Sequence, residues 1–156
     1  MNRLDELLRL RDQQRSLRKD ARMTVHGKDL EWEENRFGRM KWYLHPAIED
    51  TVIKDYVFFM MEIPPGTRTG RIHQQGNEVI LILEGRGWTV LNGVRHDWKA
   101  GDVVALPLRQ QGNTVQHFNA DPEKPARFVS ARPNLSDPLG VDQGVGLEIL
   151  EDAPRQ

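Results

Sequence analysis

The sequence predicts an all-β fold, a barrel or sandwich of short strands, preceded by one N-terminal helix. Two observations support this prediction. From residue 40 onward, about eight short runs rich in β-branched and aromatic residues follow one another, each bounded by Gly, Pro or Asn. No helical periodicity interrupts them, whereas residues 2 to about 20 place leucines among charged residues at helical spacing.

The predicted N-terminal helix is amphipathic, with a narrow apolar stripe. Leu4, Leu7, Leu8 and Leu10 lie among Arg, Asp and Gln, and Leu17 follows two turns later. Two interpretations fit this pattern: a dimerisation or lid helix, and a surface helix packed on its own domain. We interpret the basic residues near its end as a solvated face.

Turn residues separate the predicted strands. Pro46 and the Pro64-Pro65-Gly66 run end the first two, and Asn92-Gly93 marks a hairpin because both residues tolerate positive φ. The predicted strands cover residues 40–46, 56–63, 78–84, 88–91, 94–99, 103–107, 115–119, 126–131 and 147–150. We divide the chain into a helix and arm (1–50) that belong to the same domain as the barrel (51–135), and a tail (136–156).

Composition narrows the function classes. The chain has 156 residues and no cysteine, so disulfides are excluded and any metal must be held by His, Asp, Glu or amide oxygen. A net charge of -1 gives no electrostatic reason to expect a nucleic-acid partner. No apolar run is long enough for a membrane span, and the charged N-terminus does not resemble a signal peptide, so we expect a cytoplasmic protein.

Three residues carry the candidate chemistry: His73, Glu78 and His117. Two imidazoles and a carboxylate that converge can hold a divalent metal on one face and leave its other positions open, as in non-haem Fe(II) oxygenases. Glu78 begins an otherwise apolar strand, where an unpaired carboxylate would be costly. A metal would neutralise its charge, and so would Arg71. If residues 71–75 are extended, Arg71, His73 and Gln75 share a face.

The spacing of these residues resembles the two motifs of the cupin family, the conserved-barrel or jelly-roll proteins. The first motif, G-x5-H-x-H-x3,4-E-x6-G, is echoed by Gly66, His73, Glu78 and Gly85. The second motif, G-x5-P-x-G-x2-H-x3-N, is echoed by Gly101, Pro107 and His117. The resemblance covers roughly residues 55 to 132 and implies a jelly-roll barrel.

Two departures from the family pattern affect the predicted site. The usual cupin ligands are three histidines and one glutamate, but the first motif of this chain contains one histidine. Aligning the motif on Glu78 puts His73 at its second histidine and Arg71 at its first. The stretch between Pro107 and His117 is longer than the motif allows, which implies an enlarged loop.

The resemblance implies a metal-dependent enzyme, similar to ring-cleaving dioxygenases of the gentisate type, that acts on a small aromatic or acidic compound. In this hypothesis His73, Glu78 and His117 bind the metal, and Arg71 acts in catalysis by anchoring the substrate carboxylate. Gln75 and Gln116 are further candidate substrate contacts. Fe(II) is the favoured ion, with Mn, Ni and Zn as alternatives.

The alternative is a metal-free cupin that binds a small molecule without catalysis. In that case Arg71 pairs with Glu78, and the two histidines make hydrogen bonds. The resemblance also implies a homodimer, for which the N-terminal helix and arm supply additional apolar surface.

Overall fold

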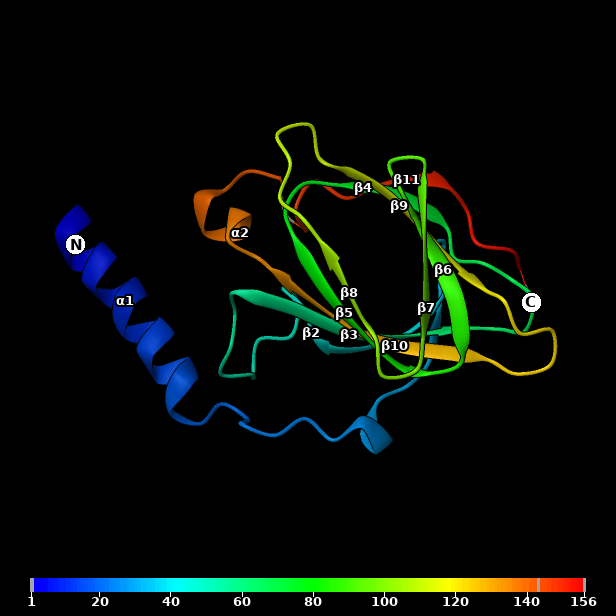
Figure 1. The fold of residues 1–156 in the computed structure, drawn as a ribbon. Helices are drawn as coiled ribbons and strands as arrows, with labels where there is room; N and C mark the ends of the chain where they lie inside the picture. The colour runs from blue at the N-terminus through cyan, green and yellow to red at the C-terminus, as the bar shows by residue number, and fades with distance from the viewer. Residues whose placement is uncertain (1, 143, 156) are drawn as a thin grey trace.

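A computed structural model of the chain describes residues 2–142 and 144–155. Two antiparallel sheets face each other as the layers of a barrel (Figure 1). One sheet has the strand order β1 (Glu33–Glu34), β2 (Arg39–Leu44), β3 (Tyr56–Ile63), β10 (Ala126–Pro133), β5 (Glu78–Glu84) and β8 (Val103–Leu106). The other has the order β11 (Glu148–Glu151), β4 (Arg71–Gln74), β9 (Asn113–Asn119), β6 (Arg86–Leu91) and β7 (Val94–Lys99).

The predicted all-β barrel with an N-terminal helix is confirmed. Strands β3, β5 and β7 have the predicted bounds, and the Asn92-Gly93 turn has positive φ at both residues. The short strand β4 was predicted only as an extended segment. The sheets also include β1, β2 and β11, which lie outside residues 51–135. A short helix, α2 (Ser136–Leu139), follows β10.

The core lies between the two sheets. Side chains alternate between the two faces of each strand, so every second residue points inward. Strand β3 illustrates the rule, with Phe59, Met61 and Ile63 buried and Phe58 and Met60 partly exposed on the other face. The same alternation places polar side chains of β5, β9 and β10 inside the barrel.

A row of charged residues crosses the outer face of the six-stranded sheet. Each member is the register partner of the next, on five adjacent strands: Glu34, Arg39, Glu62, Arg127 and Glu84. The ion pairs between successive members measure 3.6, 3.5, 2.6 and 3.4 Å between nitrogen and oxygen. Opposite charges on paired strands favour this register, because a one-residue slip would separate every pair. We call these five residues the charged row.

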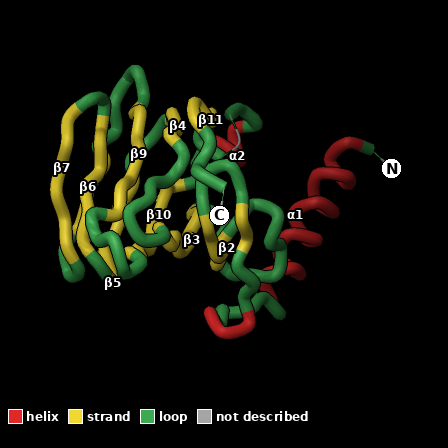
Figure 2. Tube along the Cα trace, turned by 90° about the vertical axis from the view of Figure 1, so that its right-hand side faces the viewer, coloured by secondary structure: helices red, strands yellow, loops and turns green. Residues whose placement is uncertain are grey.

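Helix α1 (Arg3–Lys19) stands beside the barrel and not on it (Figures 1 and 2). The Asn2 side chain caps its first turn by accepting from the Asp5 N–H at 2.9 Å. None of its residues is buried, so packing on its own domain, one of the two interpretations of the sequence, is not observed. Within the described ranges, no helix is both long and apolar enough to cross a membrane.

Candidate functional site

A buried carboxylate, Glu78, is at the centre of a polar cluster inside the barrel. The Ser130 hydroxyl and the Gln74 amide donate to its two oxygens, with 2.7 Å from Gln74 Nε2 to Oε2. Arg132 lies on the same carboxylate, with Nε 3.2 Å from Oε1. We call Gln74, Glu78, Ser130 and Arg132 the interior cluster. Its members come from β4, β5 and β10, so only the folded barrel brings them together.

Strand alternation explains how these polar residues come to lie inside. In β10 the inward positions are occupied by Phe128, Ser130 and Arg132. In β4 they are occupied by Ile72 and Gln74. The apolar residues of each strand hold its face against the core, and the polar residues follow two positions further on.

The cluster keeps Glu78 ionised. Burial alone would raise the pKa of this carboxyl group, but the charge of Arg132 and the hydrogen bonds from Ser130 and Gln74 outweigh that effect. The net result is a pKa below the usual value for a glutamate. Glu78 and Arg132 therefore form a compensated ion pair in the barrel interior.

Three polar atoms of the cluster have no hydrogen-bond partner in the described part of the chain: Nε and Nη2 of Arg132 and Oε1 of Gln74, all fully buried. Nε has the Glu78 carboxylate as its ion-pair partner, which leaves Nη2 of Arg132 and Oε1 of Gln74. The Arg132 guanidinium also lies over the Phe59 and Phe37 rings, 5.0 and 5.8 Å from their centroids. Because buried polar groups in folded proteins are almost always hydrogen-bonded, these two atoms call for a partner from outside the chain.

His117 is the second predicted site residue that lies inside the barrel. Its Nδ1 is 2.8 Å from the Thr89 hydroxyl, which accepts a hydrogen bond from Trp98 Nε1 at 3.0 Å. The Thr89 hydrogen can then be donated to Nδ1, which favours the tautomer protonated at Nε2. Burial lowers the pKa of His117 to about 4, and Arg132 adds to this, although Glu78 opposes it. The imidazole is therefore neutral at physiological pH.

The structure does not bring His73 to Glu78 and His117. His73 lies on the outer side of β4, where its Nε2 donates to the Gln111 carbonyl oxygen at 2.9 Å. The expected convergence of three ligands is thus corrected to two inward residues, with Gln74 at the inner position of β4. A shift of one residue along a strand moves each side chain to the opposite face.

Arg71, Gln75 and Gln116 lie outside the interior cluster as well. Arg71 points outward and pairs with Glu151 of β11 at 3.8 Å, so it does not neutralise Glu78. Gln75 is exposed in the turn after β4. Gln116 is buried, and its amide donates to the Thr69 carbonyl oxygen at 3.0 Å.

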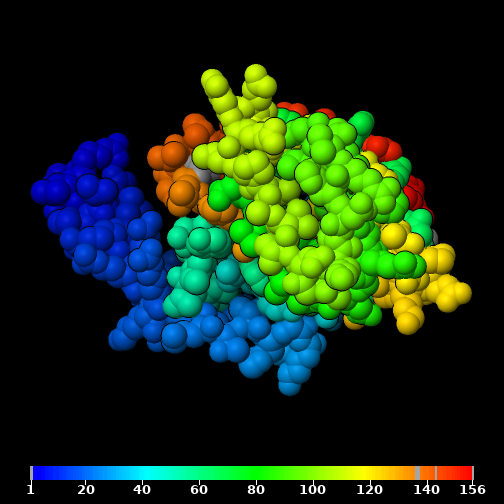
Figure 3. All heavy atoms as spheres, viewed as in Figure 1, coloured from blue at the N-terminus to red at the C-terminus, as the bar shows by residue number. Residues whose placement is uncertain are grey.

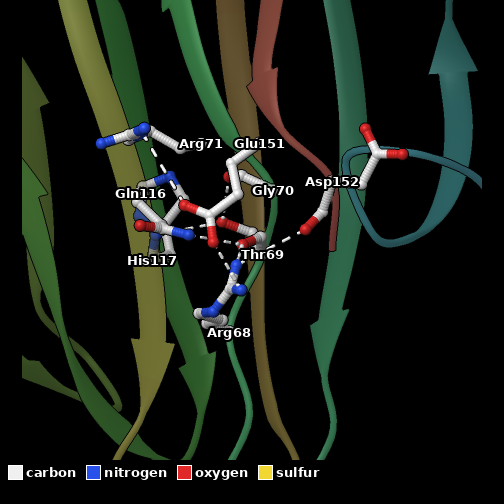
Figure 4. A network of polar contacts seen from close by, with 8 residues as sticks. All are labelled: Arg68, Thr69, Gly70, Arg71, Gln116, His117, Glu151 and Asp152. Carbon is white, nitrogen blue, oxygen red and sulfur yellow. Dashed lines mark hydrogen bonds and ion pairs between the residues drawn. The ribbon is translucent and has the colours of Figure 1, made fainter. Parts of the chain in front are cut away.

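Arg71 and Gln116 belong to a network of polar contacts that holds the C-terminal strand against the barrel (Figure 4). Arg68 Nη2 pairs with Glu151 at 2.6 Å, and Arg71 approaches the other oxygen of the same carboxylate. The Thr69 hydroxyl accepts from the backbone N–H of His117 at 3.0 Å. The network therefore ties β11 and residue 69 to β9, the strand that carries His117.

Three cluster residues were not identified from the sequence: Gln74, Ser130 and Arg132. The cupin motif allows three or four residues between its second histidine and its glutamate, and the shorter spacing before Glu78 selects Gln74. The inward position of Arg132 would have followed from extending the alternation of Phe128 and Ser130 by two residues, but the predicted strand ended at residue 131. Both signals were present in the sequence.

Comparison with known proteins supports the fold. Residues 59–132 match the family described as the cupin domain. The matched residues lie within the barrel, and its two facing sheets form a jelly roll of the cupin type. No curated protein matches the sequence.

Several solved structures have the same fold. The polyketide cyclase RemF from Streptomyces resistomycificus superposes with a TM-score of 0.58 at 18% identity, over 72% of this chain and 79% of that one. A predicted oxalate decarboxylase from Thermotoga maritima has a TM-score of 0.57 at 24% identity, over 71% and 98%. A cupin-like protein from the same organism has a TM-score of 0.56 at 18% identity, over 84% and 86%. At these identities the likeness concerns the fold alone.

A divalent metal in a protein is usually held by at least three converging His, Cys, Asp or Glu side chains. Within residues 2–142 and 144–155, no group of three or more His, Cys, Asp or Glu side chains is placed to hold a metal ion. Both oxygens of Glu78 are already engaged, and among the described residues only His117 brings an imidazole close to Glu78 and Arg132. This arrangement does not fit a metal centre with three protein ligands.

Proposed function

We propose that this cupin domain binds a small, uncharged polar molecule in its barrel, without a metal ion held by three side chains. One observation carries the proposal: Arg132 Nη2 and Gln74 Oε1 are a buried donor and a buried acceptor without partners in the described chain. A bound group that accepts from the first and donates to the second would satisfy both. A hydroxyl or a primary amide has this capacity.

The charges of the interior favour an uncharged ligand. Glu78 is ionised and compensated by Arg132, and His117 is neutral, so these three groups sum to zero. An anionic ligand would bring an uncompensated charge into a site closed to water, which is costly. The Phe37 and Phe59 rings beneath Arg132 offer apolar contact for the remainder of the molecule.

The competing hypothesis is a metal-dependent, dioxygenase-like enzyme that acts on an aromatic or acidic compound. It would require Arg132 to leave Glu78 and a third ligand to take the place of His73. It would also require a substrate anchor other than Arg71, which pairs with Glu151 on the outer face. The placement of the three predicted ligands therefore favours the metal-free binder.

The proposal can be tested with two probes of similar shape, acetamide and acetate. We expect acetamide to shift the side-chain N–H signals of Arg132 and Gln74 in NMR titrations, and acetate to leave them in place. Arg132→Met should abolish the acetamide response. Arg71→Met, which removes an exposed guanidinium from the outer side of β4, should preserve it.

Two results would overturn the proposal. One is an acetate response in the same N–H signals stronger than the acetamide response. The other is stoichiometric Fe, Mn, Ni or Zn in protein purified without a polyhistidine tag, lost in His117→Ala, since such an ion would establish a metal centre.

A further inference from the structure

The outer face of the six-stranded sheet is apolar beyond the charged row. Two rows of side chains cross four adjacent strands, and each residue is the register partner of the next. The first row consists of Met60, Val129, Leu81 and Val103, and the second of Phe58, Ala131, Val79 and Ala105. We call these eight residues the outer apolar face.

Half of this face is open to solvent. On β3 and β10 its side chains are partly covered by their neighbours. On β5 and β8 they are exposed, with Val79 at 51% and Val103 at 58%. An antiparallel sheet that is apolar on both faces must bury both of them. Exposed apolar patches of this kind mark interaction sites.

The chain's own arm covers the opposite end of the sheet. Trp32 lies over Arg39 and Lys41, 4.9 Å from each cation to the ring centroid. Lys41 also donates to the Gly27 carbonyl oxygen at 3.0 Å. The arm therefore ends over β2. Three strands separate β2 from β8, so the two strands lie roughly 19 Å apart at the usual strand spacing.

Helix α1 is the second unpartnered apolar surface. Leu4, Leu7 and Leu17 are 63, 63 and 57% exposed. In the space-filling view the helix forms a separate lobe at the side of the barrel (Figure 3). The segment just after the helix is tied to the loop before β3. Arg22 makes an ion pair with Asp50 at 2.7 Å and forms an isolated β-bridge with Thr51. An isolated helix of 17 residues is marginal in water and needs a packing partner.

We infer that α1 of one chain docks on the outer apolar face of a second copy, so that two chains cover each other reciprocally. Each copy carries both surfaces, and its arm leads the helix away from its own β5 and β8. The helix is about 25 Å long and about 10 Å wide, enough to cover two rows across four strands. A reciprocal exchange of this kind gives a closed, two-fold dimer.

Charge complementarity agrees with this partner. Helix α1 has six basic and three acidic side chains, a net charge of +3. The charged row that borders the outer apolar face has three carboxylates and two guanidiniums, a net charge of -1. Opposite signs on the two surfaces favour the encounter and fix its orientation.

The test uses sedimentation equilibrium of the full chain and three variants. The wild-type chain should be a dimer, and both Leu7→Glu/Leu10→Glu in the helix and Leu81→Glu on the sheet should be monomers. Val94→Glu places the same charge on an exposed residue of β7, in the other sheet, and should remain a dimer. A mixture of the helix and sheet variants should form a heterodimer, because one helix and one sheet face remain intact.

Other ways of covering the helix and the outer apolar face predict different oligomeric states for these variants. A monomeric wild-type chain, or a dimer that survives the helix variant, would overturn the proposal. A dimer broken by the helix variant but not by Leu81→Glu would indicate helix-to-helix pairing and would also overturn it. As the chain has no cysteine, Leu10→Cys/Leu81→Cys offers a second measurement, in which oxidation should give a covalent dimer and not an internal crosslink.

Discussion

The guanidinium of Arg132 lies on the carboxylate of Glu78 inside the barrel, with Nε 3.2 Å from Oε1. The two side chains are only 5% and 1% exposed, so water does not screen either charge. They meet because β10 and β5 are adjacent strands and both residues occupy inward positions. The charge of each residue is therefore compensated by the other.

Arg132→Met should destabilise the protein by about 3–5 kcal/mol, because it leaves a buried carboxylate uncompensated. The double variant Glu78→Gln/Arg132→Met should recover much of that loss, since it removes both charges. Urea unfolding of the two variants and the wild type measures the difference. Equal losses of stability in the single and double variants would show that Arg132 stabilises the protein through packing and not through its charge.

Gln74→His combined with Arg132→Met should create a metal site. The new imidazole would share the interior with Glu78 and His117, and the guanidinium that occupies the carboxylate would be gone. Titration with Co(II), followed by its visible absorption, should show one equivalent bound. Arg71→His combined with Arg132→Met is the matched control and should gain no affinity, because residue 71 points outward. Equal binding by the control would contradict the observed strand register.

Stability should fall as the pH is lowered from about 6.5 toward 4. The pKa of His117 is about 4 in the folded protein against 6.5 for an ordinary histidine, so the unfolded chain binds the proton more tightly. The contribution of neutral His117 to the free energy of unfolding is complete above pH 6.5 and is lost as the pH falls toward 4. Its upper limit is about 3 kcal/mol. Urea midpoints of the wild type and His117→Phe across this range measure it, and parallel pH profiles would contradict the assignment.

Glu62→Gln should cost about 1–3 kcal/mol, because Glu62 is 11% exposed and pairs with both Arg39 and Arg127. Glu34→Gln, at the exposed end of the same charged row, should change stability by less than about 0.5 kcal/mol. Thermal unfolding at low and high salt compares the two variants. Similar losses of stability in both variants would mean that burial at the centre of the charged row does not strengthen its ion pairs.

His73→Ala should loosen the loop between β8 and β9 without affecting the barrel interior. The side chain anchors this loop through the Gln111 carbonyl oxygen, and it lies against Gly112, where an added Cβ would approach His73 Cε1 to 2.6 Å. Hydrogen exchange should become faster in residues 108–112 and stay slow at His117. Faster exchange at His117 itself would indicate that His73 supports the interior after all.

Much of the fold could be predicted because it depends on local patterns. Alternation along residues 56–63 and 78–84 and the Asn92-Gly93 turn each define a strand or a turn without information from elsewhere in the chain. The site was less predictable. The choice between His73 and Gln74 depends on how many residues the turn before Glu78 takes up, and one residue decides which of them faces inward.

The sequence by itself determined the strand pattern, the N-terminal helix, and the inward positions of Glu78 and His117. Only the tertiary structure decided that Arg132, 54 residues beyond Glu78, is the partner of that carboxylate. It also decided that Arg71 and His73 face outward. The physical reason is that strand pairing is non-local: which charge compensates a buried carboxylate depends on which strands lie side by side, and periodicity within one strand does not contain that information.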